Sequence, residues 1–145
     1  MTYQTRSAEE RRRDIQAHAA SLGIDDAFIE TLVETFYGRV REHDRLGPIF
    51  NGEIDDWPDH LAKLKDFWAS VAMSAGRYSG KPVPAHMKLE GVRREDFGEW
   101  LGLFRRTLED IAPGAETVDY FMVRAERIAQ SLQFAMFGLE SLERR

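Results

Sequence analysis

Cysteine is absent from this chain of 145 residues. Its absence excludes disulfide bonds, thiolate metal sites and a cysteine nucleophile. An excess of basic residues is also missing, because 20 lysines and arginines stand against 25 aspartates and glutamates, for a formal net charge of −5. A phosphate backbone requires a basic face on its partner, so this balance argues against nucleic acid as the main partner.

Long apolar segments are missing as well. The longest uncharged run covers residues 128–139 and is too short to span a bilayer. The N-terminal stretch MTYQTRSAEERRRDIQ contains no apolar core of the signal-peptide type. Its basic run, residues 11–13, lies between acidic side chains and is typical of a solvated helix face. These features predict a cytoplasmic protein without a membrane segment.

The chain does contain enough apolar material for a core. Hydrophobic residues make up 43% of it, with nine phenylalanines and three tryptophans, which predicts a single domain over residues 1–145. Helical spacing predicts helices over residues 8–21, 26–43, 57–76, 94–111 and 115–142, with a tight corner at 46–50. The first helix has few apolar residues, so residues 1–23 are expected to form an N-terminal extension. Because no segment reads as a strand, the predicted fold class is all-α.

Polar side chains on apolar helix faces are the first candidate functional groups. Tyr37, His60 and Trp100 lie on the inner stripes of three predicted helices. Each one alone is typical of a core residue whose polar tip is satisfied. The sequence has no glycine-rich phosphate loop and no nucleophile elbow to accompany them. His18 and His43 have no such setting, and we expect both at the surface.

A further candidate, His86, lies in the least regular part of the chain. The surrounding segment, residues 76–91, holds three glycines and two prolines. A neutral imidazole is a good ligand for iron or zinc. One histidine cannot complete a tetrahedral zinc site in a chain without cysteine. One histidine is enough for haem iron, because the porphyrin supplies the other four nitrogens.

Seven short motifs follow one another in a distinctive order. They are FYGRV at 36–40, LGPIF at 46–50, DDW and a histidine within 55–60, FW at 67–68, GRYSGKPVPAH at 76–86, WLGLF at 100–104 and AERIAQSL at 125–132. In this order and spacing, the sequence resembles a truncated haemoglobin of the third group. The resemblance extends from about Ile29 to Leu139.

This resemblance implies a globin-like two-on-two helical sandwich around one haem b. It implies His86 as the proximal ligand of a five-coordinate iron. The residues matching the distal ligand-binding site are Tyr37, His60, Leu64 and Trp100. The expected haem pocket is formed by Phe50, Phe67, Trp68, Met87 and Phe97. The candidates for contact with the haem propionates are Arg77, Tyr78, Lys81 and Lys88.

Three classes of function are compatible with this set of residues. The first is reversible binding of O2 or another diatomic ligand such as NO or CO. The second is an enzyme for nitric oxide dioxygenation or peroxidase-like chemistry, which requires an external reductase. The third is a haem-free helical interaction module, in which every candidate residue is ordinary core. His60 has three possible roles: it donates to the ligand, gates its access or binds the iron itself.

Overall fold

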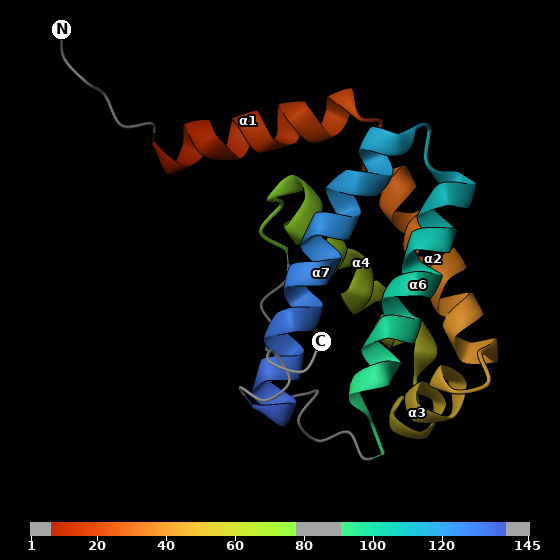
Figure 1. The fold of residues 1–145 in the computed structure, drawn as a ribbon. Coiled ribbons are helices and arrows are strands. Elements are labelled where there is room, and N and C mark those ends of the chain that lie inside the picture. Colours follow the sequence, from red (N-terminus) through yellow and green to blue (C-terminus); the bar gives the residue numbers. More distant parts are fainter. Residues whose placement is uncertain (1–6, 78–90, 139–145) are drawn as a thin grey trace, which may run out of the picture.

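The computed structural model describes residues 7–77 and 91–138 of the chain (Figure 1). Within these ranges the structure contains six helices and no strand. They are α1 (Ala8–Ser21), α2 (Asp26–Glu42), α3 (Leu46–Glu53), α4 (Trp57–Met73), α6 (Arg94–Ile111) and α7 (Ala115–Phe137). The prediction of an all-α fold is therefore confirmed for the described residues.

Local side-chain caps begin three of these helices at the predicted positions. In each case a side-chain oxygen accepts a hydrogen bond from the backbone N–H three residues later, which satisfies a donor that the helix itself cannot pair. The pairs are Ser7 with Glu10 at 3.1 Å, Asp25 with Phe28 at 2.8 Å and Asp56 with Asp59 at 3.1 Å. Helix α6 has the predicted bounds at both ends.

Two predicted helices end earlier than expected. Helix α4 stops at Met73, not at residue 76, because Ser74 takes a left-handed conformation with φ of 52°. Helix α7 stops at Phe137, not at residue 142, where Gly138 has φ of 78°. Both ends follow the general preference for a positive φ just past a helix, a conformation that glycine adopts without steric cost.

The predicted corner at residues 46–50 is wrong, because these residues lie in α3. His43 explains the difference: its Nδ1 atom accepts the backbone N–H groups of Arg45 and Leu46, both at 3.1 Å. The imidazole thus caps a helix whose own first residues carry no capping side chain. His43 is consequently half-buried and not a surface residue, whereas His18 is exposed as predicted.

The core lies between two pairs of helices. Helix α2 packs against α4 and α6, and α6 packs against α7. Their inward faces supply the largest fully buried side chains, namely Trp68, Phe36, Phe104, Phe121 and Ile29. In the described part of the chain, no helix is both long and apolar enough to cross a membrane.

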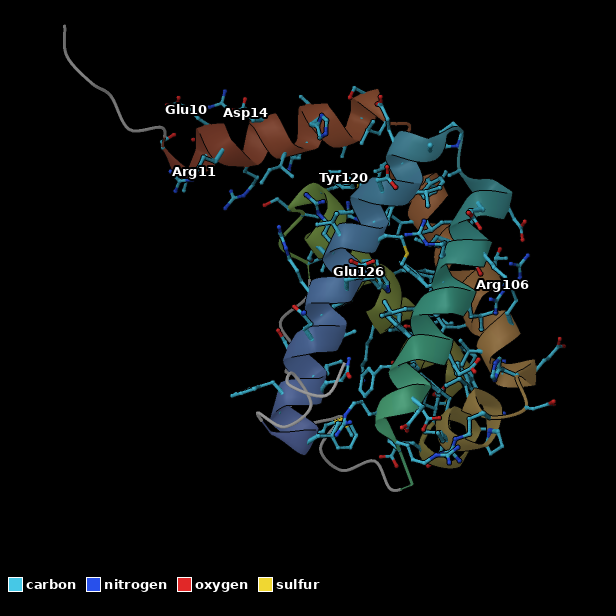
Figure 2. The ribbon with its side chains drawn as sticks, in the orientation of Figure 1. Glu10, Arg11, Asp14, Arg106, Tyr120 and Glu126 are labelled. Carbon is cyan, nitrogen blue, oxygen red and sulfur yellow. The ribbon has the colours of Figure 1, made fainter. Side chains whose placement is uncertain are left out.

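Helix α1 lies outside this arrangement. It runs across one end of the helical body and extends beyond it (Figure 1), with Ala19 as its buried residue. Glu10, Arg11 and Asp14 lie toward its outer end, away from the other helices (Figure 2). The basic run at residues 11–13 is exposed, which confirms the prediction of a solvated helix face.

Candidate functional site

A cavity of about 520 Å³ lies among α2, α3, α4, α6 and α7. Most of its wall is apolar, with Leu46 and Ile49 from α3 and Ile128, Ala129 and Leu132 from α7. Its volume is within the usual range for small-molecule and cofactor sites. The cavity is therefore large enough for an organic cofactor and suited to an apolar one.

Every described member of the predicted distal site and haem pocket lines this cavity. These residues are Tyr37, Phe50, His60, Leu64, Phe67, Trp68, Phe97 and Trp100. They come from four helices and span more than 60 positions of the sequence. The remaining predicted residues, His86, Met87, Tyr78, Lys81 and Lys88, lie outside the described residues.

Tyr37 places a buried hydroxyl in the cavity wall. The residue is 4% exposed, and its ring lies 6.1 Å from that of Phe50. Burial raises the pKa of the Tyr37 hydroxyl, because a phenolate there would lose its hydration. Interactions with the side chains of Trp68 and Trp100 lower the same pKa to a lesser extent. The hydroxyl is therefore neutral at physiological pH and has a proton to donate.

Phe104 orients the two indoles beside Tyr37. Its ring stacks against Trp68 at 4.9 Å and 23° and against Trp100 at 5.4 Å and 4°. Phe36 also contacts this cluster of rings edge-on, with ring centroids 4.9 Å from Phe104 and 5.5 Å from Trp100. Such ring pairs favour defined orientations. The packing therefore holds an indole of α4 and an indole of α6 in fixed positions.

His60 lies at the polar side of the cavity. Its ring meets that of Trp57 edge-on, with 5.8 Å between the centroids. The charged side chains that line the cavity near it in sequence are Glu53, Asp55, Asp56, Asp59 and Lys63. Lys63 is paired with Asp59 at 3.0 Å. The sequence analysis missed these charged residues, and also Asp96, because nothing in the local pattern shows that they face a cavity.

Arg77 is a predicted propionate contact that the structure does not bring to the cavity. Its guanidinium donates to both carboxylate oxygens of Asp26, at 2.6 and 3.2 Å. Its backbone N–H donates to Ser70 Oγ at 2.9 Å. Both interactions connect Arg77 with the start of α2 and the end of α4, and its contact with a haem propionate stays a prediction.

The fold and the cavity together define an all-helical protein with one aromatic, ligand-sized site between two helix pairs. The chain is 36% identical over 118 residues to "Group 3 truncated hemoglobin ctb" of Campylobacter jejuni, covering 79% of this chain and 92% of that protein. The crystal structure of group III truncated hemoglobin from Campylobacter jejuni matches with a TM-score of 0.73, at the same identity and coverage. No family model matches the chain. On this identity and coverage, the chain belongs to the truncated haemoglobin family, in its third group.

Membership of this family confirms the predicted globin-like fold. The two helix pairs, α2 with α4 and α6 with α7, are the two layers of the helical sandwich. Helix α1 precedes them in the chain (Figure 1).

Proposed function

We propose that the cavity binds one haem b and that the haem binds O2 or another diatomic ligand. One observation carries this proposal: eight residues matched to a haem pocket by sequence, from four helices, line the same cavity. His86 is the proposed proximal ligand. It enters the proposal through its place in the GRYSGKPVPAH motif, because it lies outside the described residues.

The lining of the cavity fits such a group. A haem needs a large apolar pocket with aromatic walls, and Phe50, Phe67 and Phe97 supply aromatic surface from three different helices. A haem held by His86 alone would supply an iron that can bind a diatomic ligand. The chain's own groups then determine how firmly that ligand is held.

Tyr37 is the proposed main donor to the ligand, with Trp100 second. A diatomic ligand with partial negative charge is stabilised by preorganised donors, most strongly where water is excluded. The Tyr37 hydroxyl meets this condition, because it is buried and neutral. Trp68 supplies a further indole close to the Tyr37 oxygen. His60 also lines the cavity, and its proposed roles are to donate to the ligand, to control its access or to bind the iron itself.

An enzyme activity is the second candidate function. The observation in its favour is that the Tyr37 hydroxyl and the indoles of Trp68 and Trp100 line one cavity. Donors grouped in this way would hold bound O2 strongly and polarise its O–O bond. Such a site suits nitric oxide dioxygenation or peroxidase-like chemistry more than delivery of O2. Electrons for turnover would come from an external reductase. Slow O2 release with rapid consumption of nitric oxide or peroxide favours the enzyme, and fast release favours carriage.

The first test is the visible absorption spectrum of the protein expressed with haem available, in ferric and ferrous form. We expect a strong Soret band that weakens or shifts in His86→Ala. His18→Ala is the matched control, because His18 is exposed on α1, and its spectrum should equal that of the unmodified protein. A folded, colourless protein that takes up no added haemin would overturn the proposal.

The second test addresses Tyr37. Replacing it by phenylalanine removes a hydrogen bond to a partly charged ligand, which is worth roughly 1.5–3 kcal/mol. We therefore expect Tyr37→Phe to release O2 at least about tenfold faster, measured by stopped-flow displacement. Tyr120→Phe is the control, because Tyr120 is also buried but does not line the cavity. An unchanged rate in Tyr37→Phe would remove this residue from the proposed role.

A further inference from the structure

His43 is a titratable side chain that the proposed function does not use. It lies between α2 and α3, and its Nδ1 atom accepts the backbone N–H groups of Arg45 and Leu46, both at 3.1 Å. Its carbonyl oxygen accepts the N–H of Gly47 at 2.8 Å. The next residue, Pro48, has no N–H. His43 thus pairs the N–H groups with which α3 begins, and these are groups that a helix cannot pair by itself.

This cap exists in only one protonation state of the imidazole. A ring nitrogen that accepts hydrogen bonds carries no proton, so the proton of the neutral ring is on Nε2. The Nε2 atom lies 3.5 Å from a carboxylate oxygen of Glu99 on α6. A second proton would bind at Nδ1 and turn the acceptor into a donor that faces two other donors. The cap of α3 is therefore present while His43 is neutral and is lost as the pH falls.

Charged side chains near His43 come from α2, from the connection to α3, from the far end of α3 and from α6. They are Arg41, Glu42, Asp44, Arg45, Glu53, Asp96 and Glu99. Arg45 donates from Nε to Asp96 Oδ1 at 2.7 Å, and Arg41 lies over the ring of Trp57 at 4.6 Å. The remaining acidic groups near the ring are exposed apart from their contact with it. The Glu99 carboxylate faces Nε2, which is protonated in both states, so it cannot restore the cap at Nδ1.

Helix α3 carries one wall of the cavity. Its residues Leu46, Ile49 and Phe50 line the cavity. The Phe50 ring lies 6.1 Å from the ring of Tyr37, the proposed main donor to the ligand. Because α3 has only eight residues, it has few backbone hydrogen bonds of its own, and the cap is a large part of what holds its start. Loss of the cap therefore loosens the wall beside Tyr37.

We propose that His43 is a positioning residue for the ligand site, which holds α3 against Tyr37 only while its imidazole is neutral. This inference rests on the proposed function. An imidazole is the side chain that changes its charge between about pH 5 and 8. Retention of the bound diatomic ligand then weakens as the pH falls, because the wall of the cavity loosens.

Three forms of the haem-loaded protein separate the cap from the charge: the unmodified protein, His43→Asn and His43→Ala. Asparagine is a good helix cap, because its side-chain oxygen accepts backbone N–H groups, and it does not titrate. Alanine removes the cap at every pH. Two properties are measured at about pH 5 and about pH 8. They are hydrogen exchange of the α3 amides, corrected for the intrinsic exchange rate, and the rate of O2 release by stopped-flow displacement.

In the unmodified protein we expect the α3 amides to exchange at least about fivefold faster at the lower pH, as for the loss of a helix cap. His43→Asn should keep slow exchange at both pH values, and His43→Ala should show fast exchange at both. O2 release should accelerate at the lower pH by at least about threefold more in the unmodified protein than in His43→Asn. His18→Ala is the matched control, because His18 is an exposed histidine on α1, and it should behave as the unmodified protein.

Equal pH dependence in the unmodified protein and His43→Asn would overturn the inference. O2 release that is the same in all three forms would overturn it as well, even if the exchange of α3 changes. If His43→Ala does not fold, His43→Asn decides the question by the same two measurements. A protein that takes up no haem would instead overturn the proposed function.

Discussion

Replacement of Phe104 by leucine tests whether a core residue outside the cavity governs ligand retention. Phe104 is fully buried and absent from the cavity wall, but its ring stacks on both Trp68 and Trp100. Each stacked pair is worth about 0.5–1.5 kcal/mol beyond the burial of its area. Loss of two pairs, together with imperfect filling of the space, should lower the free energy of unfolding by about 2–4 kcal/mol.

The effect on the ligand is smaller but more informative. Without the stack, the two indoles lose their fixed orientation beside Tyr37. We expect Phe104→Leu to release O2 about three- to tenfold faster, which corresponds to roughly 0.6–1.4 kcal/mol. Urea unfolding of the haem-free protein measures the change in stability, and stopped-flow displacement measures the release of O2.

Phe121→Leu separates the two effects. Phe121 is equally buried, but it meets Trp68 tilted by 54° at 6.2 Å without stacking. The substitution Phe121→Leu should lower the free energy of unfolding by an amount comparable to Phe104→Leu. It should leave the rate of O2 release close to that of the unmodified protein. Equal release rates in Phe104→Leu and Phe121→Leu would refute the reasoning, because the loss of stability alone would then explain every change.

Three further substitutions test the scaffold. Gly47→Ala places a Cβ atom 2.7 Å from a backbone carbonyl oxygen of α2, and we expect a loss of about 1–3 kcal/mol, seen as a lower melting temperature in calorimetry. Tyr120→Phe removes the hydrogen bond from its hydroxyl to the carbonyl oxygen of Ala72 at 2.6 Å, and urea unfolding should show a loss of about 1–3 kcal/mol. Hydrogen bonds from Arg45 lower the pKa of Asp96 in the folded protein. The stability that this carboxylate contributes is therefore complete above the ordinary aspartate pKa of about 3.9. It disappears as the pH falls through the lowered pKa of the folded protein. The difference in urea midpoint between Asp96→Asn and the unmodified protein should therefore be large at pH 7 and small at pH 2, and a difference independent of pH would contradict this assignment.

The sequence by itself determined where most helices lie and which faces they bury. Helix α6 begins and ends at the predicted residues, and α2 and α4 begin at the predicted residues, capped by Asp25 and Asp56. These features can be predicted from the sequence because apolar periodicity and side-chain caps involve residues only three or four positions apart. The same periodicity placed Tyr37 and Trp100 on inward faces, and the order of the motifs indicated the family.

Only the tertiary structure decided how these faces meet. The cap of α3 comes from an imidazole outside the helix, the stack on Phe104 joins α4 to α6, and the Arg45–Asp96 pair links residues 51 positions apart. It also showed that Arg77 pairs with Asp26, 51 positions away. Such contacts depend on the relative placement of whole helices, which follows from the packing of all their faces at once. Local pattern therefore predicts the elements, whereas the partners of a charged or aromatic side chain depend on the assembled core.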